Sequence, residues 1–224
     1  RSYCLYKKNI DRLAQAPPEF QCRACLTDSS EEWSQEWAAR IAAADIILFL
    51  WMGTGLDAPF CQKASRFMQR RQLRHLILVE NPGKDKITIG FTPEQILRVK
   101  QYFRYDGQEN LYQCILWLGN TFGGTSYAAA EPKLLPWNGV WHPEWTEDCQ
   151  DIAGYLQAHY VAGRPTVGVM FYRTEWLTGD FTYHTALIRA LEAQGLNVIA
   201  IFTNTVSSAE LDSPSLMDAV HPYF

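Results

Sequence analysis

The sequence lacks any hydrophobic run long enough to cross a membrane. Its longest apolar segment is Ile46–Met52, IILFLWM, whereas a transmembrane helix needs about 20 apolar residues. The chain starts at Arg1 with neither an initiator methionine nor a charged and then apolar leader, so no secretory signal is predicted. We therefore expect a cytoplasmic protein without a transmembrane segment.

An excess of basic residues is also missing. The 224-residue chain has 20 lysines and arginines against 24 aspartates and glutamates, which gives a net charge of −4. Nucleic-acid binders normally carry a basic face, so we expect no nucleic-acid partner. The short basic cluster is predicted to be a solvated helix face rather than a phosphate-binding surface. Its members are Arg66, Arg70, Arg71 and Arg74.

Paired metal-ligand motifs are absent from the sequence. Cys22 and Cys25 have C-x-x-C spacing, but no second such pair completes a zinc site, and the six cysteines are expected to be reduced. The five histidines show no i, i+4 spacing. His142, which lies in the segment Trp141–Pro143, is expected to be a hydrogen-bonding surface residue. We predict no metal site and no bound cofactor, and the sequence identifies no catalytic residue.

The first half of the chain alternates strand and helix patterns. Ile46–Met52 is apolar at every position, as in parallel strands that are covered on both faces. A helix is predicted before this strand, and residues 28–30 offer N-cap side chains for its start. A helix over about Pro59–Gln72 and a strand over His75–Val79 follow. This order predicts an α/β fold with a doubly wound, mostly parallel sheet of the Rossmann or flavodoxin-like type.

The second half of the chain begins another α/β unit. The predicted elements are helices over about Thr92–Phe103, Glu109–Phe122, Thr146–Val161, Tyr183–Gln194 and Ser207–Tyr223, and strands over Thr166–Tyr172 and Val198–Phe202. We predict an N-terminal α/β domain over residues 1–123, a linker over residues 124–145, and the start of a second α/β domain over residues 146–224. Because the second unit has too few strands for a complete sheet, we expect the chain to be a fragment of a larger protein.

Polar and aromatic side chains follow the strand that ends at Tyr172. The apolar residues Val167–Phe171 predict a strand that is buried on both faces. Because α/β sheets bind ligands outside the carboxyl ends of their strands, the residues that follow are candidates for substrate binding. The candidates are Tyr172, Arg173, Trp176 and Asp180. The alternative is that Asp180 caps the next helix and that Arg173 pairs with it or with Glu175.

A second candidate is the turn Gly53-Thr54-Gly55, which lies between a predicted strand and a predicted helix. Backbone N–H groups at the start of a helix can bind an anion, so this turn is a candidate anion-binding turn. The third glycine of the dinucleotide-binding fingerprint is absent, because Pro59 and Phe60 follow. A tight turn without a ligand is the alternative.

Three segments carry distinctive motifs. YDGQENLYQCILWLGNTFGG stands at Tyr105–Gly124, LPWNGVWHPEW at Leu135–Trp145, and Arg164–Phe202 contains VGVMFYR, ALIRALE and GLNV. In order and spacing, these segments resemble the CobN and magnesium-chelatase H family, the large subunits of the enzymes that insert metal ions into tetrapyrroles. The resemblance covers about residues 40–204. The loop Trp51–Gly55, WMGTG, departs from the family's usual pattern.

This resemblance implies a role in a tetrapyrrole metal chelatase. The large subunit of the family binds the tetrapyrrole, and separate AAA+ ATPase subunits use ATP to drive the reaction. Co2+ or Mg2+ is then a substrate of the complex, and this chain alone is not expected to be catalytic. A cobaltochelatase, which is a ligase of cobalamin biosynthesis, is favoured because LPWNGVWHPEW is closer to that type.

Other functions stay open at this point. The first alternative is a magnesium-chelatase H subunit, which acts on protoporphyrin IX. A second alternative is a non-catalytic α/β ligand-binding or interaction module, of the periplasmic-binding or receiver type. A receiver needs clustered acidic residues at strand ends for a metal ion, and Asp28 and Asp45 are scattered. A third alternative is a nucleotide-sugar enzyme with a phosphate bound at Gly53-Thr54-Gly55.

Overall fold

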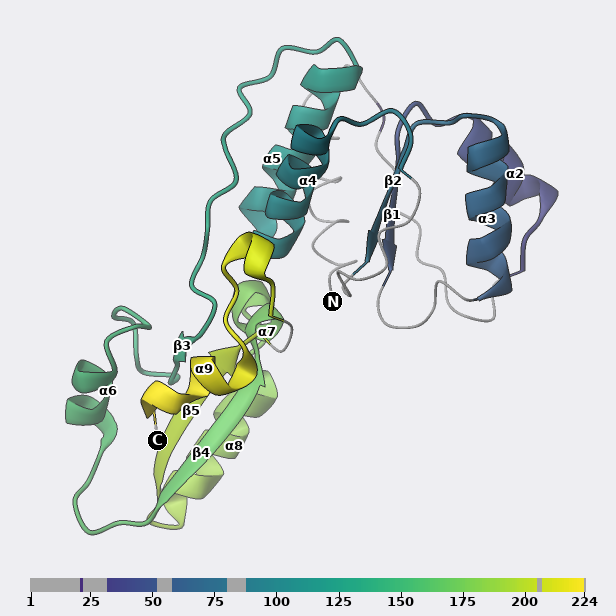
Figure 1. Cartoon of the computed structure of the whole chain (residues 1–224). Helices are drawn as coiled ribbons and strands as arrows, with labels where there is room; N and C mark the ends of the chain where they lie inside the picture. The colour runs from purple at the N-terminus through teal and green to yellow at the C-terminus, as the bar shows by residue number, and fades with distance from the viewer. Residues whose placement is uncertain (1–20, 22–31, 52–57, 80–87, 205–206, 224) are drawn as a thin grey trace. The chain divides into compact units, whose positions relative to one another are not determined.

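The computed structural model describes residues 21, 32–51, 58–79, 88–204 and 207–223. They form a mixed α/β structure that divides into two compact units, with the boundary between Lys133 and Leu134 (Figure 1). This boundary falls inside the predicted linker, and the domain limits inferred from the sequence stay a prediction. Among these residues, no helix is both long enough and apolar enough to span a membrane.

Some predicted features lie outside the described residues. They are Cys22, Cys25 and the turn Gly53-Thr54-Gly55. The cysteines that the structure describes, Cys61, Cys114 and Cys149, are not in disulfide bonds, and the reduced state of all six cysteines stays a prediction. Burial raises the pKa of the Cys61 thiol to about 12, so this group stays protonated and unreactive at neutral pH.

The N-terminal unit contains, in its described residues, a pair of parallel strands and four helices. Its elements are α2 (Gln35–Ala42), β1 (Ile47–Trp51), α3 (Pro59–Arg70), β2 (His75–Val79), α4 (Pro93–Tyr105) and α5 (Gln108–Phe122). The strands pair in register from Ile47↔His75 to Trp51↔Val79. The predicted strand–helix–strand crossover β1–α3–β2 is therefore confirmed.

Side-chain caps explain where two of these helices begin. Ser34 accepts a hydrogen bond from the backbone N–H of Trp37 at 3.2 Å, which satisfies a free donor of the first turn of α2. The prediction of a cap at residues 28–30 is wrong for this helix, because residues 32–34 are not helical. In α4, Thr92 accepts from the N–H of Gln95 at 3.3 Å, and the Gln95 side chain accepts from the N–H of Thr92 at 2.9 Å.

The two-stranded sheet of the N-terminal unit is packed on both faces. Ile47 and Phe49 contact the buried residues of α2 and α3. Their neighbours Ile46 and Leu48 contact the buried residues of α4 and α5. Because successive side chains of a strand point to opposite faces, one helix pair covers each face of this sheet (Figure 1), as expected from its apolar sequence.

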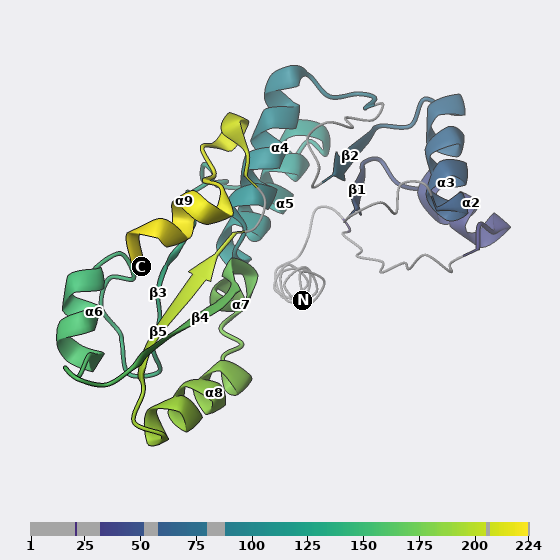
Figure 2. The ribbon, with the colours of Figure 1, turned by 60° about the horizontal axis from the view of Figure 1, so that its bottom comes forward.

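The C-terminal unit is built on a three-stranded mixed sheet (Figure 2). Its elements are β3 (Gly139–Val140), α6 (Ile152–His159), β4 (Thr166–Tyr172), α7 (Arg173–Thr178), α8 (Thr182–Ala193), β5 (Asn197–Thr203), η3 (Ala209–Leu211), α9 (Leu216–Val220) and η4 (His221–Tyr223). The strand order is β3-β5-β4, with β5 parallel to β4 and antiparallel to β3. β3, which was not predicted, comes from the segment expected to be a linker.

Several predicted elements of this unit differ from the observed ones. The residues after Tyr172 form the helix α7 instead of a loop. α6 begins only at Ile152, because the Asp151 carboxylate accepts a hydrogen bond from the N–H of Gly154 at 2.9 Å and caps the helix there. The predicted C-terminal helix is broken into η3, α9 and η4. One break follows η3 at Asp212, whose φ of 53° is left-handed.

The two long strands of this sheet differ in burial. Every residue of β5 is buried, because the strand is central in its sheet and a core cluster packs on each of its faces. In β4, Phe171 is 6 % exposed and faces the core, whereas Met170 is 53 % and Tyr172 is 59 % exposed. The prediction that Val167–Phe171 is buried on both faces is therefore wrong in the described chain. β4 lies at an edge of the sheet, and on its second face Met170 lines an open pocket together with Leu216, Met217 and Val220 of α9.

Tyr155 connects α6 to the central strand of the C-terminal unit. Its side chain is fully buried, and its hydroxyl donates a hydrogen bond to the carbonyl oxygen of Val198 in β5 at 3.0 Å. Burial raises the pKa of this phenol to about 12, because the interior disfavours the phenolate. The folded state therefore holds the Tyr155 proton up to a higher pH than the unfolded state does.

The variant Tyr155→Phe is expected to lose about 1 kcal/mol of unfolding free energy at pH 7, because the Val198 carbonyl loses its donor. The pKa lies near 10 in the unfolded chain and near 12 in the folded one. The contribution of the neutral phenol to the free energy of unfolding is fully present below pH 10, and it is lost as the pH rises toward 12. Between these values, the wild type should lose stability faster than the variant by about 1.4 kcal/mol per pH unit.

Urea unfolding curves at pH 7, 10 and 11.5 measure this difference. Tyr160→Phe is a matched control, since Tyr160 is 48 % exposed. If the wild type and Tyr155→Phe had parallel pH profiles above pH 10, the phenol would not be buried in the folded protein.

Candidate functional site

The first candidate site lies where β4 ends and α7 begins. Tyr172 is the last residue of β4, and its ring is exposed at the surface. The Glu175 carboxylate accepts a hydrogen bond from the backbone N–H of Tyr172 at 3.3 Å, which fixes the junction of strand and helix. Gly179 ends α7 with a φ of 69°, a left-handed conformation that glycine adopts without strain. Three of the four predicted site residues, Tyr172, Arg173 and Trp176, thus belong to one short segment.

Arg173 is buried, with 4 % of its surface exposed. Its Nε donates to the carbonyl oxygen of Pro136 at 2.7 Å, and its Nη2 donates to the carbonyl oxygen of Leu135 at 3.1 Å. The guanidinium also lies over the ring of Trp137, 4.7 Å from the centroid, within the range of a cation–π interaction. In this conformation Arg173 holds the segment before β3, and its guanidinium is not presented to a ligand at the surface.

Trp176 and Asp180 have different surroundings. The Trp176 ring stacks on Phe202 of β5, with centroids 4.3 Å apart and planes only 6° apart, so that face of the indole belongs to the core. Asp180 is exposed. The N-cap residue of α8 is Phe181, whose side chain makes no capping hydrogen bond, and the alternative that Asp180 caps this helix stays a prediction.

The same segment contributes to a buried acid–base group. The Glu175 carboxylate, 4 % exposed, lies 3.1 Å from Nε2 of His184. It also accepts hydrogen bonds from the Tyr183 hydroxyl at 3.2 and 3.3 Å. The sequence did not identify Glu175 or His184 as a pair. The signal that was present is their location, since Glu175 lies in α7 and His184 in the first turn of α8, both shortly after the end of β4.

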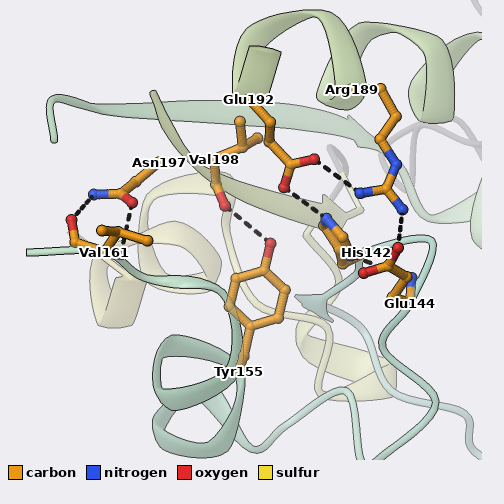
Figure 3. A network of polar contacts seen from close by, with 8 residues as sticks. All are labelled: His142, Glu144, Tyr155, Val161, Arg189, Glu192, Asn197 and Val198. Atoms are coloured by element: carbon orange, nitrogen blue, oxygen red, sulfur yellow. Dashed lines mark hydrogen bonds and ion pairs between the residues drawn. The ribbon is translucent and has the colours of Figure 1, made fainter. Parts of the chain in front are cut away.

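A second polar group of the C-terminal unit surrounds His142 (Figure 3). His142 is 1 % exposed, so the prediction of a surface histidine is wrong. Its Nε2 lies 2.9 Å from a carboxylate oxygen of Glu192, and its Nδ1 accepts a hydrogen bond from the backbone N–H of Glu144 at 3.1 Å. Arg189 donates to the Glu192 carboxylate at 3.0 Å and also to that of Glu144.

The negative charge of Glu192 in this second group is stabilised by its hydrogen-bond partners. Burial alone raises the pKa of the Glu192 carboxyl, but hydrogen bonds from His142 and Arg189 outweigh burial and hold this pKa below its usual value. Glu192 is therefore ionised at neutral pH. The Nδ1 of His142 accepts a hydrogen bond, and its Nε2 faces a carboxylate. When His142 is neutral, its proton is therefore on Nε2.

His159, the last residue of α6, contacts His142 from the other side. The centroids of the two imidazole rings are 3.9 Å apart, with an angle of 34° between the planes. The rings of Tyr155 and Trp145 enclose His159, with centroids 5.0 and 6.1 Å away. Its pKa is lowered, first by burial and then by the proximity of His142. Ligand atoms of His142, Glu144 and His159 all lie within 4.8 Å of one another.

Sequence analysis missed His159 because it relied on short spacings. The two histidines are separated by a turn, the cap residue Asp151 and the whole of α6. Only the fold of the C-terminal unit brings their rings together. The predicted anion-binding turn, Gly53-Thr54-Gly55, lies outside the described residues.

Comparison with known proteins gives one family match. The model of a family described as CobN/Magnesium Chelatase matches residues 100–222, which is more than half of the chain. This range contains all three motif segments of the sequence analysis. It does not reach back to residue 40, where the resemblance was expected to begin.

Individual relatives match a similar portion of this chain. The aerobic cobaltochelatase subunit CobN of Pseudomonas aeruginosa is 34% identical over 134 residues, which is 57% of this chain and 10% of that protein. An uncharacterized protein of Methanocaldococcus jannaschii is 29% identical over 129 residues, again 57% of this chain and 10% of that protein. The chain thus spans about a tenth of the length of these curated relatives.

A solved structure also matches. The catalytic subunit of cobaltochelatase from Mycobacterium tuberculosis aligns with 80% of this chain and 14% of its own, at 20% sequence identity and a TM-score of 0.46.

Proposed function

Because the chain belongs to the CobN/magnesium chelatase family, we propose that it is part of the large, tetrapyrrole-binding subunit of a metal chelatase. The observation that carries this proposal is the family match over residues 100–222, which includes all three motif segments. The proposed reaction is the insertion of a divalent metal ion into a tetrapyrrole, so the ion is a substrate and not a resident cofactor.

Cobalt is the proposed metal. The relative with 34% identity is named as a cobaltochelatase subunit, which favours cobalt insertion into a corrinoid precursor during cobalamin biosynthesis. The second candidate is the H subunit of a magnesium chelatase, which inserts magnesium into protoporphyrin IX. The name of the matching family, which covers both enzymes, supports keeping this candidate.

The partners and the energy source are also proposals. We propose that AAA+ ATPase subunits act on the assembled enzyme, that ATP is used there, and that the whole complex is a cytoplasmic ligase. This chain acts as scaffold and as partial cover for the ring, without catalytic residues of its own. The helices on both faces of β1 and β2 support the further proposal that these strands belong to a doubly wound sheet.

Among the predicted site residues, Tyr172 is the best placed to touch a macrocycle. Its ring is 59 % exposed at the carboxyl end of β4, and an aromatic ring can stack on a flat tetrapyrrole. Asp180 lies on the surface just after α7. Arg173 and Trp176 are engaged in packing and would act by positioning Tyr172. An anion contact at Gly53-Thr54-Gly55 stays part of the proposal.

The proposal is tested by titrating the protein with a cobalt-free corrinoid, with protoporphyrin IX and with a nucleotide, while tryptophan fluorescence is followed. We expect the corrinoid to bind and the nucleotide not to bind. Tyr172→Ala should weaken ring binding about 3- to 10-fold, the value of one aromatic contact.

Tyr160→Ala is the matched control for this titration, because Tyr160 is a similarly exposed tyrosine of the same unit. Tight binding of protoporphyrin alone would transfer the proposal to magnesium chelatase. Binding of the nucleotide alone would contradict the chelatase function and favour the nucleotide-sugar alternative. Ring binding that Tyr172→Ala leaves unchanged would remove Tyr172 from the site.

A further inference from the structure

The group around His142 contains more ligand atoms than its structural role requires. Two imidazoles and a carboxylate lie within 4.8 Å of one another, and Glu192 supports one of the imidazoles (Figure 3). We propose that His142, Glu144 and His159 form a binding site for a divalent transition-metal ion. The inference goes beyond the proposed function and does not depend on it.

His142 is held in the orientation of a metal-binding histidine. Its Nε2–H donates to the Glu192 carboxylate at 2.9 Å, the contact that commonly orients metal ligands and raises their basicity. Its other nitrogen, Nδ1, carries a lone pair directed at the backbone of Glu144. Nδ1 is therefore the ligand atom, and it has to exchange the hydrogen bond from the Glu144 N–H for the ion, which then lies beside the Glu144 side chain.

His159 supplies the second nitrogen. Its Nε2 is buried and has no hydrogen-bond partner among the described residues. A buried polar atom without a partner is costly and uncommon in native proteins. Coordination of an ion would satisfy it. Because the two rings lie against each other at a tilt, with centroids 3.9 Å apart, His159 has to rotate so that both nitrogens approach within about 2.1 Å of the ion.

The third ligand, the Glu144 carboxylate, is held by Arg189 in this structure. Arg189 bridges Glu144 and Glu192, so its guanidinium supplies positive charge between two carboxylates. Arg189 is 43 % exposed and can turn into solvent. An arriving cation would take its place at Glu144, whereas Glu192 would keep both its contact with His142 and its role in orienting that ring.

The ligand set selects a class of ion. Imidazole nitrogen is preferred by zinc, cobalt, nickel and copper ions, whereas magnesium and calcium prefer oxygen ligands. Two imidazoles and one carboxylate also leave at least one coordination position open to water or to a further ligand. We therefore expect Zn2+ and Co2+ to bind here, and Mg2+ and Ca2+ not to bind.

The test measures Zn2+ binding by calorimetry and Co2+ binding by visible absorption. Cys22 and Cys25 have metal-ligand spacing, so the measurements use a Cys22→Ser/Cys25→Ser background. His159→Ala and Glu144→Gln should each weaken binding about 10-fold or more. Glu192→Gln should weaken it about 10- to 100-fold, as is typical for groups that orient a ligand.

Two further variants keep the test decisive. Arg189→Gln removes the competing charge, so it should tighten Zn2+ binding, which loss of a purely structural ion pair would not do. His221→Ala replaces an exposed histidine of the same unit and should leave binding unchanged. Circular dichroism shows whether each variant is folded. The proposal is overturned if the parent protein binds neither ion, or if folded His159→Ala binds as tightly as the parent.

Discussion

Replacing Arg173 by alanine is expected to lower the free energy of unfolding of the C-terminal unit by about 3 kcal/mol. Hydrogen bonds from a charged donor contribute about 1.5–3 kcal/mol each, and Arg173 makes two of them to the carbonyls of Leu135 and Pro136. The variant also loses the contact with Trp137. The prediction is measured by urea unfolding, followed by circular dichroism.

Two further variants define what the guanidinium does. Arg173→Lys keeps the charge but loses the planar fork, so it should recover less than half of the lost stability. Arg164→Ala removes an exposed arginine of the same unit and should have almost no effect. If Arg173→Ala were as stable as the wild type, the guanidinium would not be needed by the fold, and direct pairing with a tetrapyrrole carboxylate would regain support.

The second large effect is expected at Glu175. Replacing it by alanine removes the carboxylate that faces His184 at 3.1 Å and accepts from Tyr183 and the backbone of Tyr172. Loss of one partner of a buried pair costs about 3–5 kcal/mol, because the His184 ring stays buried without the carboxylate. Urea unfolding of Glu175→Ala should show a loss in this range.

The matched control for this prediction is Glu147→Ala, since Glu147 is an exposed glutamate of the same unit. A double-mutant cycle between Glu175→Gln and His184→Ala then isolates the interaction of the two side chains. A coupling energy of about 0.5–3 kcal/mol is expected for groups in contact. Zero coupling would show that the two groups act independently and that their proximity contributes nothing to stability.

The elements that sequence pattern placed best are those with strong local signals. The strand that ends at Tyr172 was predicted with its observed bounds, and β5 extends the predicted Val198–Phe202 by one residue at each end. The helix between them, α8, is followed by Gly195, whose φ of 76° matches the predicted helix stop. Periodicity and turn residues act over a few positions, so they are visible without the fold.

Burial of β4 could not be predicted in the same way. Met170 is as apolar as a core residue, yet it is 53 % exposed, because exposure depends on which elements cover each face of the sheet. The same limit applies to Arg173. Its partners, Leu135 and Pro136, lie in another segment of the chain, and the sequence around Arg173 gives no sign of them.

The candidate sites show the same difference between local sequence signals and features that depend on packing. The sequence located Tyr172 and its neighbours because strand ends in α/β sheets are known positions for ligands. It did not pair Glu175 with His184, or His142 with His159, since no short motif links them. Such groups are found only when packing is known, and they are the parts of the site on which stability and metal binding are predicted to depend.

The pairing of β3 has a consequence for the order of events during synthesis. Gly139 and Val140 pair with Phe202 and Ile201, so β3 leaves the ribosome long before its partner strand. Closing so long a loop is entropically slow. We therefore expect the nascent segment around Trp137 and His142 to remain undocked, and open to chaperones or proteases, until translation has passed Thr203.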